Sequence, residues 1–129
     1  MTGNGKRVLI VDDDAEFAGA IATFLDTQGF ATSLASSGDE GVALAKSRRP
    51  DLILMDIMMN ERTEGFRAIR EIRRDPAMRR VPIFVVSAFC SQLPEMDSDE
   101  EGWMAHDAFL SKPVDTLQLI EKIRRWTGD

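Results

Sequence analysis

Four stretches of the sequence place polar side chains directly after an apolar run. They are V-L-I-V-D-D-D at 8–14, L-I-L-M-D at 52–56, I-F-V-V-S at 83–87 and A-F-L-S-K at 108–112. Carboxylates are ligands that Mg²⁺ prefers, and a lysine beside such an ion can hold phosphoryl oxygens. An aspartate can also be the nucleophile that accepts a phosphoryl group. Together these residue types indicate chemistry on a phosphoryl group.

The run of three aspartates, Asp12 to Asp14, raises a physical question of its own. Like charges this close disfavour one another's ionisation unless something positive lies among them. A bound divalent cation would neutralise them. The alternative is the start of a helix, because helix N-termini favour acidic residues without any ligand. Asp14 fits that alternative best, as the N-cap of the first helix.

The elements that must position these residues are a set of buried strands. Five apolar runs, at 8–11, 30–35, 52–55, 83–86 and 108–110, lack polar alternation. Such runs are typical of strands buried on both faces of a parallel sheet.

Amphipathic segments separate these runs. The first helix is expected to end near Gly29, and the second to follow Ser37, with Glu40 completing a capping-box pattern, and to stop before Pro50. A polar segment at 91–102 occupies the place of the fourth helix, which we therefore expect to be short or irregular. The apolar repeats are Phe17, Ile21, Phe24 and Leu25 in the first helix, Phe66, Ile69 and Ile72 in the third, and Leu117, Ile120 and Ile123 in the last.

Strands and helices that alternate in this way predict an α/β fold. Right-handed βαβ units give one doubly wound, five-stranded parallel sheet with helices on both faces. No composition shift marks a boundary, so we expect a single domain over 1–129. In open α/β sheets ligands bind beyond the carboxyl ends of the strands. The aspartates, Ser87 and Lys112 should therefore converge on one small volume.

The composition of the chain limits the classes of binding partner and the cellular compartment that we expect. With 16 basic and 22 acidic residues the net charge is -6, which disfavours nucleic acid and anionic membranes. Cys90 is the only cysteine, so no internal disulfide can form. No segment has the length of a signal peptide or of a membrane span. These features predict a cytoplasmic protein without membrane insertion.

The four motifs, in this order and at these separations, resemble a response-regulator receiver domain, the phosphoacceptor module of bacterial two-component signalling. The resemblance covers Lys6 to about Trp126. It implies the flavodoxin-like strand order 2-1-3-4-5. It also implies transfer of a phosphoryl group from the phosphohistidine of a sensor histidine kinase or phosphotransfer protein, followed by switched contacts with a downstream protein target. On this interpretation the chain is a signalling phosphoacceptor with self-phosphorylation and self-dephosphorylation chemistry rather than an enzyme.

The resemblance also assigns roles to single residues. Asp56 would be the phosphoacceptor. Asp12, Asp13 and Asp56, with the backbone carbonyl of Met58, would hold Mg²⁺ or Mn²⁺.

The remaining roles concern Lys112 and two residues that would change conformation on phosphorylation. Lys112 would pair with the phosphoryl group, and the hydroxyl of Ser87 would swing to bond it. Phe109 lies where the family has an aromatic switch residue, although it also suits an ordinary core position of the last strand. Pro113, after the lysine, is often cis in the family.

Two segments depart from the family pattern. After Asp56 the family usually has a proline four residues on and a glycine eight on, where this chain has Asn60 and, nine on, Gly65. The stretch from Ser87 to Lys112 is also longer than in compact members and carries an acidic insertion at 95–101.

Two other functions stay open from the sequence. A small Mg²⁺-dependent phosphohydrolase could use Asp12 as nucleophile and Asp14 as its partner. A degenerate receiver could bind partners without being phosphorylated. The chain's length disfavours the first. The second is disfavoured by the retained Asp13, Asp56, Ser87 and Lys112, but the altered loop after Asp56 keeps it open.

Overall fold

The computed structural model describes residues 5–56, 64–87 and 108–128. In this part of the chain, five strands form one parallel sheet in the order β2-β1-β3-β4-β5. This confirms the strand order that the resemblance implies. The strands are β1 (Arg7–Val11), β2 (Ala31–Ala35), β3 (Leu52–Asp56), β4 (Ile83–Ser87) and β5 (Ala108–Ser111).

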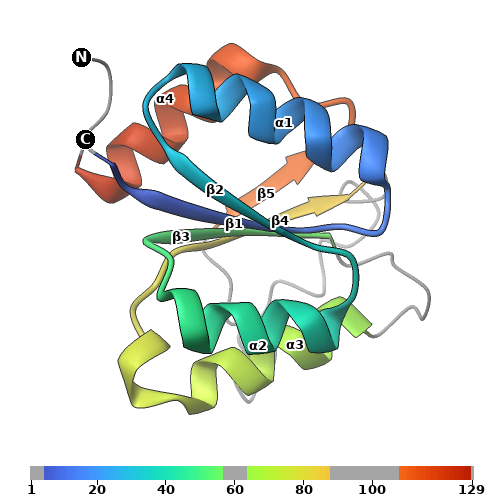
Figure 1. Ribbon diagram of the computed structural model, residues 1–129, viewed down its shortest axis with the longest axis vertical. Coiled ribbons are helices and arrows are strands. Elements are labelled where there is room, and N and C mark those ends of the chain that lie inside the picture. The colour runs from blue at the N-terminus through green and yellow to red at the C-terminus, as the bar shows by residue number, and fades with distance from the viewer. Residues whose placement is uncertain (1–4, 57–63, 88–107, 129) are drawn as a thin grey trace.

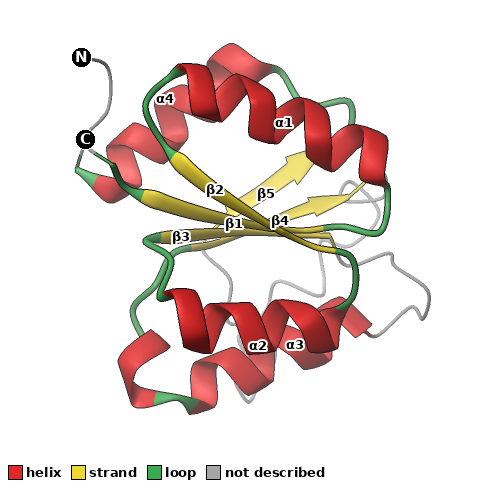
Figure 2. Ribbon diagram, viewed as in Figure 1, coloured by secondary structure: helices red, strands yellow, loops and turns green. Residues whose placement is uncertain are grey.

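Helices cover both faces of this sheet. Figure 1 shows α1 and α4 on one face and α2 and α3 on the other, and Figure 2 shows the strands as a middle layer between them. The fourth helix expected around 91–102 lies outside the described residues. The helices are α1 (Ala15–Thr27), α2 (Gly38–Arg48), α3 (Glu64–Arg74), the short 3₁₀ helix η1 (Pro76–Met78) and α4 (Thr116–Thr127).

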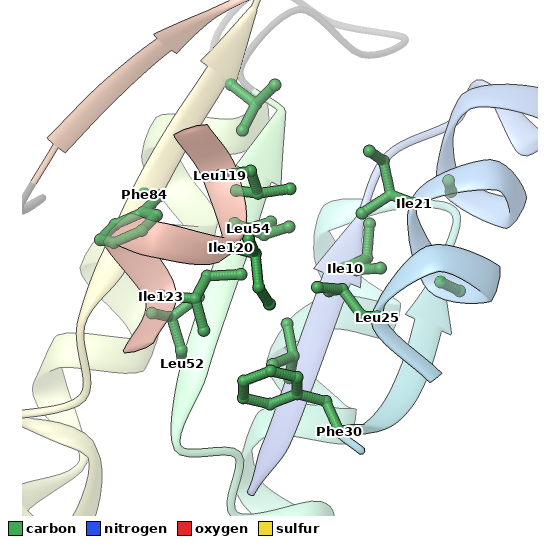
Figure 3. Close-up of a cluster of buried hydrophobic side chains, with 14 residues drawn as sticks. Ile10, Ile21, Leu25, Phe30, Leu52, Leu54, Phe84, Leu119, Ile120 and Ile123 are labelled. Carbon is green, nitrogen blue, oxygen red and sulfur yellow. The ribbon is translucent and has the colours of Figure 1, made fainter. Parts of the chain in front are cut away.

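The strands β1, β3 and β4 lack polar alternation because each of their faces meets a different hydrophobic cluster. The edge strand β2 differs from the expectation: of its five residues only Ala35 is buried, because no further strand covers its outer side. In β1, Leu9 and Val11 pack on the α2/α3 side, whereas Val8 and Ile10 pack on the α1/α4 side. Figure 3 shows the second cluster, in which side chains from both helices meet side chains of β1, β3 and β4. Two separate cores, one per face, therefore hold the sheet in place.

The predicted helix ends agree with the caps. Asp14 caps α1 by accepting from the backbone N–H of Phe17, and Ser37 caps α2 by accepting from that of Glu40. The carboxylate of Glu40 reaches back to the backbone N–H of Ser36. At the end of α1 the cap residue is Gln28, and Gly29, one residue later, has the positive φ of 93° that allows the chain to leave the helix.

The apolar repeat predicted for the last helix is wrong at one position. Leu117 is 73% exposed, and the buried face of α4 consists of Leu119, Ile120 and Ile123. Leu117 lies in the first turn, where spacing by three residues carries it around the helix away from the sheet.

Candidate functional site

The turn after β1 places the first of the predicted site residues. The backbone N–H of Asp12 donates to the carbonyl of Ala35 in β2 (2.9 Å), which continues the sheet one residue beyond β1. Oδ1 of Asp12 accepts from the backbone N–H of Asp14 (2.9 Å), and Asp14 in turn begins α1. Asp12 is thus fixed from both sides, and it is only 3% exposed.

Asp56 is the last residue of β3 and is 4% exposed. Because β1 and β3 are parallel neighbours, their carboxyl ends meet at one edge of the sheet. Carboxylate oxygens of Asp12, Asp13 and Asp56 lie within 4.8 Å of one another, with Asp13 on the exposed side. The convergence predicted from the sequence is therefore present for the aspartates.

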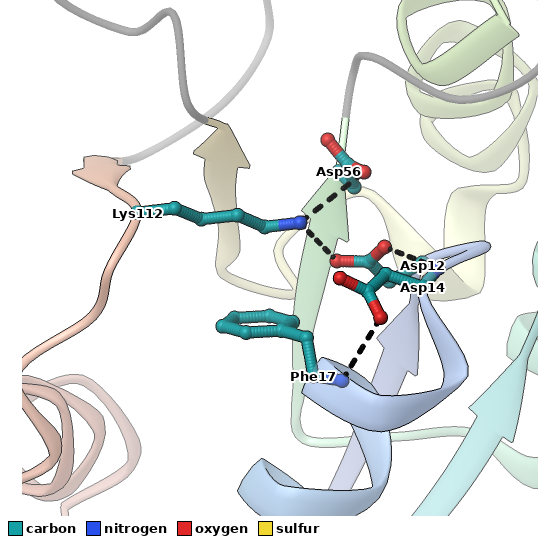
Figure 4. A network of polar contacts seen from close by, with 5 residues as sticks. All are labelled: Asp12, Asp14, Phe17, Asp56 and Lys112. Carbon is teal, nitrogen blue, oxygen red and sulfur yellow. Dashed lines mark hydrogen bonds and ion pairs between the residues drawn. The ribbon is translucent and has the colours of Figure 1, made fainter.

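Lys112 reaches this cluster from the end of β5. Its Nζ lies 2.9 Å from Oδ2 of Asp12 and 3.6 Å from Oδ2 of Asp56 (Figure 4). The residue directly precedes a proline, and the Lys112–Pro113 peptide bond is cis. The ammonium group therefore lies between the two buried carboxylates and closer to Asp12.

The negative charge of the cluster raises the pKa of Lys112. Burial lowers the pKa of Lys112, but contact with Asp12 and the negative charges of Asp56, Asp12 and Asp14 outweigh that effect and hold the pKa above its ordinary value. The protonated ammonium is thus favoured. Three clustered carboxylates and one ammonium carry a formal charge of about −2, which a divalent cation would balance.

The donor set also fits a hard cation. Oδ2 of Asp12 is shielded from solvent and has no hydrogen-bond partner among the described residues. The Nζ of Lys112, 2.9 Å away, is its ion-pair partner. A solvent-shielded carboxylate oxygen that shares one ammonium with Asp56, next to two more carboxylates, suits a metal that takes oxygen ligands.

The other predicted site residues are only partly placed. Ser87 ends β4 and pairs with Ser111 of β5, while Phe109 in β5 pairs with Val85. For Ser87 and Phe109 the structure describes the backbone alone, so their switch roles stay predictions. Met58 lies outside the described residues.

One residue of the site escaped the sequence analysis. The ring of Phe17, in α1, lies with its centroid 4.3 Å from Nζ of Lys112. The sequence pattern placed Phe17 in the apolar stripe of the first helix, and it does pack against that cluster while partly buried. Its position three residues after the N-cap Asp14 was the only sign that it would be near the aspartates.

Comparison with known families shows the family to which the chain belongs. The model of the response regulator receiver domain family matches residues 8–124. The chain belongs to this family. The receiver domain is 32% identical over 124 residues to the polar-differentiation response regulator DivK of Brucella anthropi, an alignment that covers 96% of this chain and 98% of the relative.

Solved structures agree with this assignment. The receiver domain of a sensor histidine kinase from Pseudomonas aeruginosa, which has a magnesium ion coordinated in its active-site cleft, is 30% identical with a TM-score of 0.79; the match covers 98% of this chain and all of that one, 100%. A CheY-like receiver domain from Methanospirillum hungatei is 27% identical with a TM-score of 0.81, covering 97% and 95% of the two chains. In the described part of this receiver domain, no helix is long and apolar enough to span a membrane.

Proposed function

We propose that this receiver domain accepts a phosphoryl group on Asp56 and uses it to switch its contacts with other proteins. The donor would be the phosphohistidine of a sensor histidine kinase or phosphotransfer protein, and the recipient of the signal a downstream protein. The domain would act as a signalling phosphoacceptor rather than as an enzyme that turns over a separate substrate.

The position of Asp56 is the observation that carries this proposal. Its carboxylate stands at the carboxyl end of the central strand β3, with the carboxylates of Asp12 and Asp13 on one side and Nζ of Lys112 at 3.6 Å. At this position the ammonium group, and a cation when one is bound, can stabilise the negative charge of an incoming phosphoryl group.

The transfer itself needs no other nucleophile. One carboxylate oxygen of Asp56 forms a bond to phosphorus while the P–N bond of the phosphohistidine breaks and its electron pair stays on the imidazole nitrogen. The product is an acyl phosphate, which water later cleaves to the carboxylate and inorganic phosphate. Lys112 gains a new partner in the phosphoryl oxygens.

The carboxylates of Asp12, Asp13 and Asp56, with the backbone carbonyl of Met58, would hold Mg²⁺ or Mn²⁺. When bound, the cation neutralises charge on the phosphoryl group during transfer. The hydroxyl of Ser87 and the ring of Phe109 would then respond to the added charge, which shifts an existing equilibrium between two conformations.

The geometry disfavours the phosphohydrolase alternative. Asp14 already caps α1 by accepting from the backbone N–H of Phe17 at 3.2 Å, so it is committed to the helix. Oδ1 of Asp12 accepts from the backbone N–H of Asp14, and its Oδ2 faces Lys112. An Asp12 nucleophile would have to give up one of these two contacts.

Intact mass spectrometry after incubation with acetyl phosphate and Mg²⁺ tests the proposal. We expect one added phosphoryl group in the wild type and in Asp39→Asn, a matched change of an exposed aspartate on α2. The adduct should be absent from Asp56→Asn.

The other outcomes separate the alternatives. Turnover of acetyl phosphate that Asp12→Asn abolishes and Asp56→Asn does not would establish the phosphohydrolase instead. A wild-type protein that forms no adduct and turns over no donor would indicate a receiver that binds partners without phosphorylation.

A further inference from the structure

The side chain of Phe17 joins the hydrophobic core to the acidic cluster. It leaves the first turn of α1 and packs, partly buried, against the cluster between α1, α4 and the sheet. The ring also contacts the ammonium of Lys112, whose Nζ lies 4.3 Å from the ring centroid. Figure 4 shows the ring beside the end of the lysine, next to the line of carboxylates.

Among the described residues, the ammonium of Lys112 therefore has three close neighbours, two carboxylates and one aromatic ring. Asp12 and Asp56 lie on its polar sides, at 2.9 and 3.6 Å, and the ring of Phe17 occupies a third side. An aromatic face attracts a cation through its quadrupole, and the attraction grows where water is excluded. The lysine side chain is 20% exposed, so the ring replaces part of the water that would otherwise surround the ammonium.

We propose that Phe17 is a positioning residue of the phosphorylation site, whose ring face holds the Lys112 ammonium between Asp12 and Asp56. The inference rests on the proposed function for its chemical consequence and on the contact between the ring and the ammonium for its physical basis. A lysine side chain carries its ammonium group on a flexible four-carbon stem, and it loses much conformational entropy when it is fixed. A ring already anchored in the core by α1 supplies this restraint.

The restraint matters at the moment of transfer. Negative charge then arrives on the oxygens beside Asp56, and Lys112 must turn from the carboxylates to these oxygens. An ammonium that stays against the ring turns within the site instead of swinging into solvent. Loss of the ring face should slow phosphorylation by acetyl phosphate about two- to fivefold, as expected for a partly exposed cation–π contact.

Plain packing is the competing explanation, and Phe24 provides the matched comparison. Phe24 also belongs to α1 and is also partly buried against the same cluster. The structure gives it no cation–π contact with a described residue. Any effect that arises only from removing an aromatic ring from this cluster should appear equally at Phe24.

The first test replaces Phe17 by phenylalanine with one, two or three fluorine atoms on the ring. Fluorination withdraws charge from the ring face while it changes the shape little. We expect the logarithm of the phosphorylation rate to fall steadily with each fluorine at position 17 and to stay constant with the same series at position 24. A constant rate in both series would overturn the inference.

The second test needs no phosphorylation. In the metal-free protein, Phe17→Leu and Lys112→Met should be coupled in a double-mutant cycle, by about two- to fivefold in the unfolding equilibrium constant. Phe24→Leu with Lys112→Met should be additive. Equal coupling at both phenylalanines would overturn the inference.

The two tests also separate this inference from the function on which it rests. A wild-type protein that is phosphorylated normally, with rates independent of fluorination, overturns the role of Phe17 alone. A wild-type protein that never takes up phosphoryl overturns the proposed function and with it the role of Phe17 in transfer.

Discussion

The charges at the carboxyl edge of the sheet cancel only in part. Asp12 and Asp56 are buried, and the single ammonium of Lys112 is shared between them at unequal distances. Burying a charge is costly unless it is paired, so one cation for several carboxylates leaves a deficit of positive charge. This deficit at Asp12, Asp13 and Asp56 is the physical basis of the proposed cation site, whereas Asp14 is the N-cap of α1.

Magnesium should therefore stabilise the folded protein, and Asp13 is the residue through which to measure it. Asp13 is exposed, so Asp13→Asn should change the free energy of unfolding of the metal-free protein by less than about 0.5 kcal/mol. At a Mg²⁺ concentration about 100 times the Kd, the wild type should gain about 2.7 kcal/mol. Urea unfolding with Mg²⁺ or with a chelator should show a much smaller gain in Asp13→Asn at the same concentration.

The control is Asp39→Asn, which should keep the full magnesium effect because Asp39 lies on α2 outside the cluster. Equal stabilisation of the wild type and Asp13→Asn by Mg²⁺ would contradict a site that includes Asp13.

At the scale of the elements, α2 lies in close contact with β1 at Gly41, directly beside the site. A Cβ added at Gly41 would lie 2.8 Å from Cγ2 and 3.0 Å from Cγ1 of Val11. Val11 is fully buried and immediately precedes Asp12. A glycine at this point of α2 therefore allows the helix to lie against the strand without displacing the aspartate turn.

Gly41→Ala should destabilise the protein by about 1–3 kcal/mol, because the new methyl group overpacks a closed contact. Gly19→Ala is the matched change on α1, where a Cβ would meet nothing within 4 Å. It should stabilise the helix by about 0.5–1 kcal/mol. Denaturant unfolding of both variants measures the difference.

Val11→Ala supplies the check on this mechanism. It removes both methyl groups that the new Cβ would meet, so the double variant with Gly41→Ala should lose less than the sum of the two single losses. Additive losses would mean that the cost of Gly41→Ala has another origin.

At the scale of the whole molecule, the sheet divides the interior into two cores. Ile69 of α3 lies in the core on one face, and Ile21 of α1 in the core on the other. The strands belong to both cores because their side chains alternate between the faces. Loss of either core removes half of the support of every central strand, so both should unfold together.

Ile21→Val and Ile69→Val test this arrangement. Each should cost about 0.5–1.5 kcal/mol, since each removes one buried methyl group. Because no contact joins the two sites directly, the double variant should match the sum within about 0.5 kcal/mol. Circular dichroism and tryptophan fluorescence should report a single unfolding transition; two separate transitions would show that the cores are independent.

The sequence by itself determined the elements and the identity of the aspartates at the site. Unbroken apolar runs are typical of strands covered on both faces, and the caps at Asp14 and Ser37 are local hydrogen bonds. The carboxyl ends of parallel strands must then share one edge of the sheet. These inferences follow from local sequence patterns and from the general geometry of parallel sheets, so they can be made before the structure is known.

Only the tertiary structure decided the contacts between distant segments. That Lys112 lies closer to Asp12 than to Asp56, and that the ring of Phe17 faces the ammonium, depends on how α1 and β5 are placed around the sheet. The exposure of Leu117 was also decided by the tertiary structure. The apolar spacing in α4 alone does not determine whether Leu117 or Leu119 faces the sheet. Periodicity encodes which residues share a face, whereas packing in three dimensions decides what that face contacts.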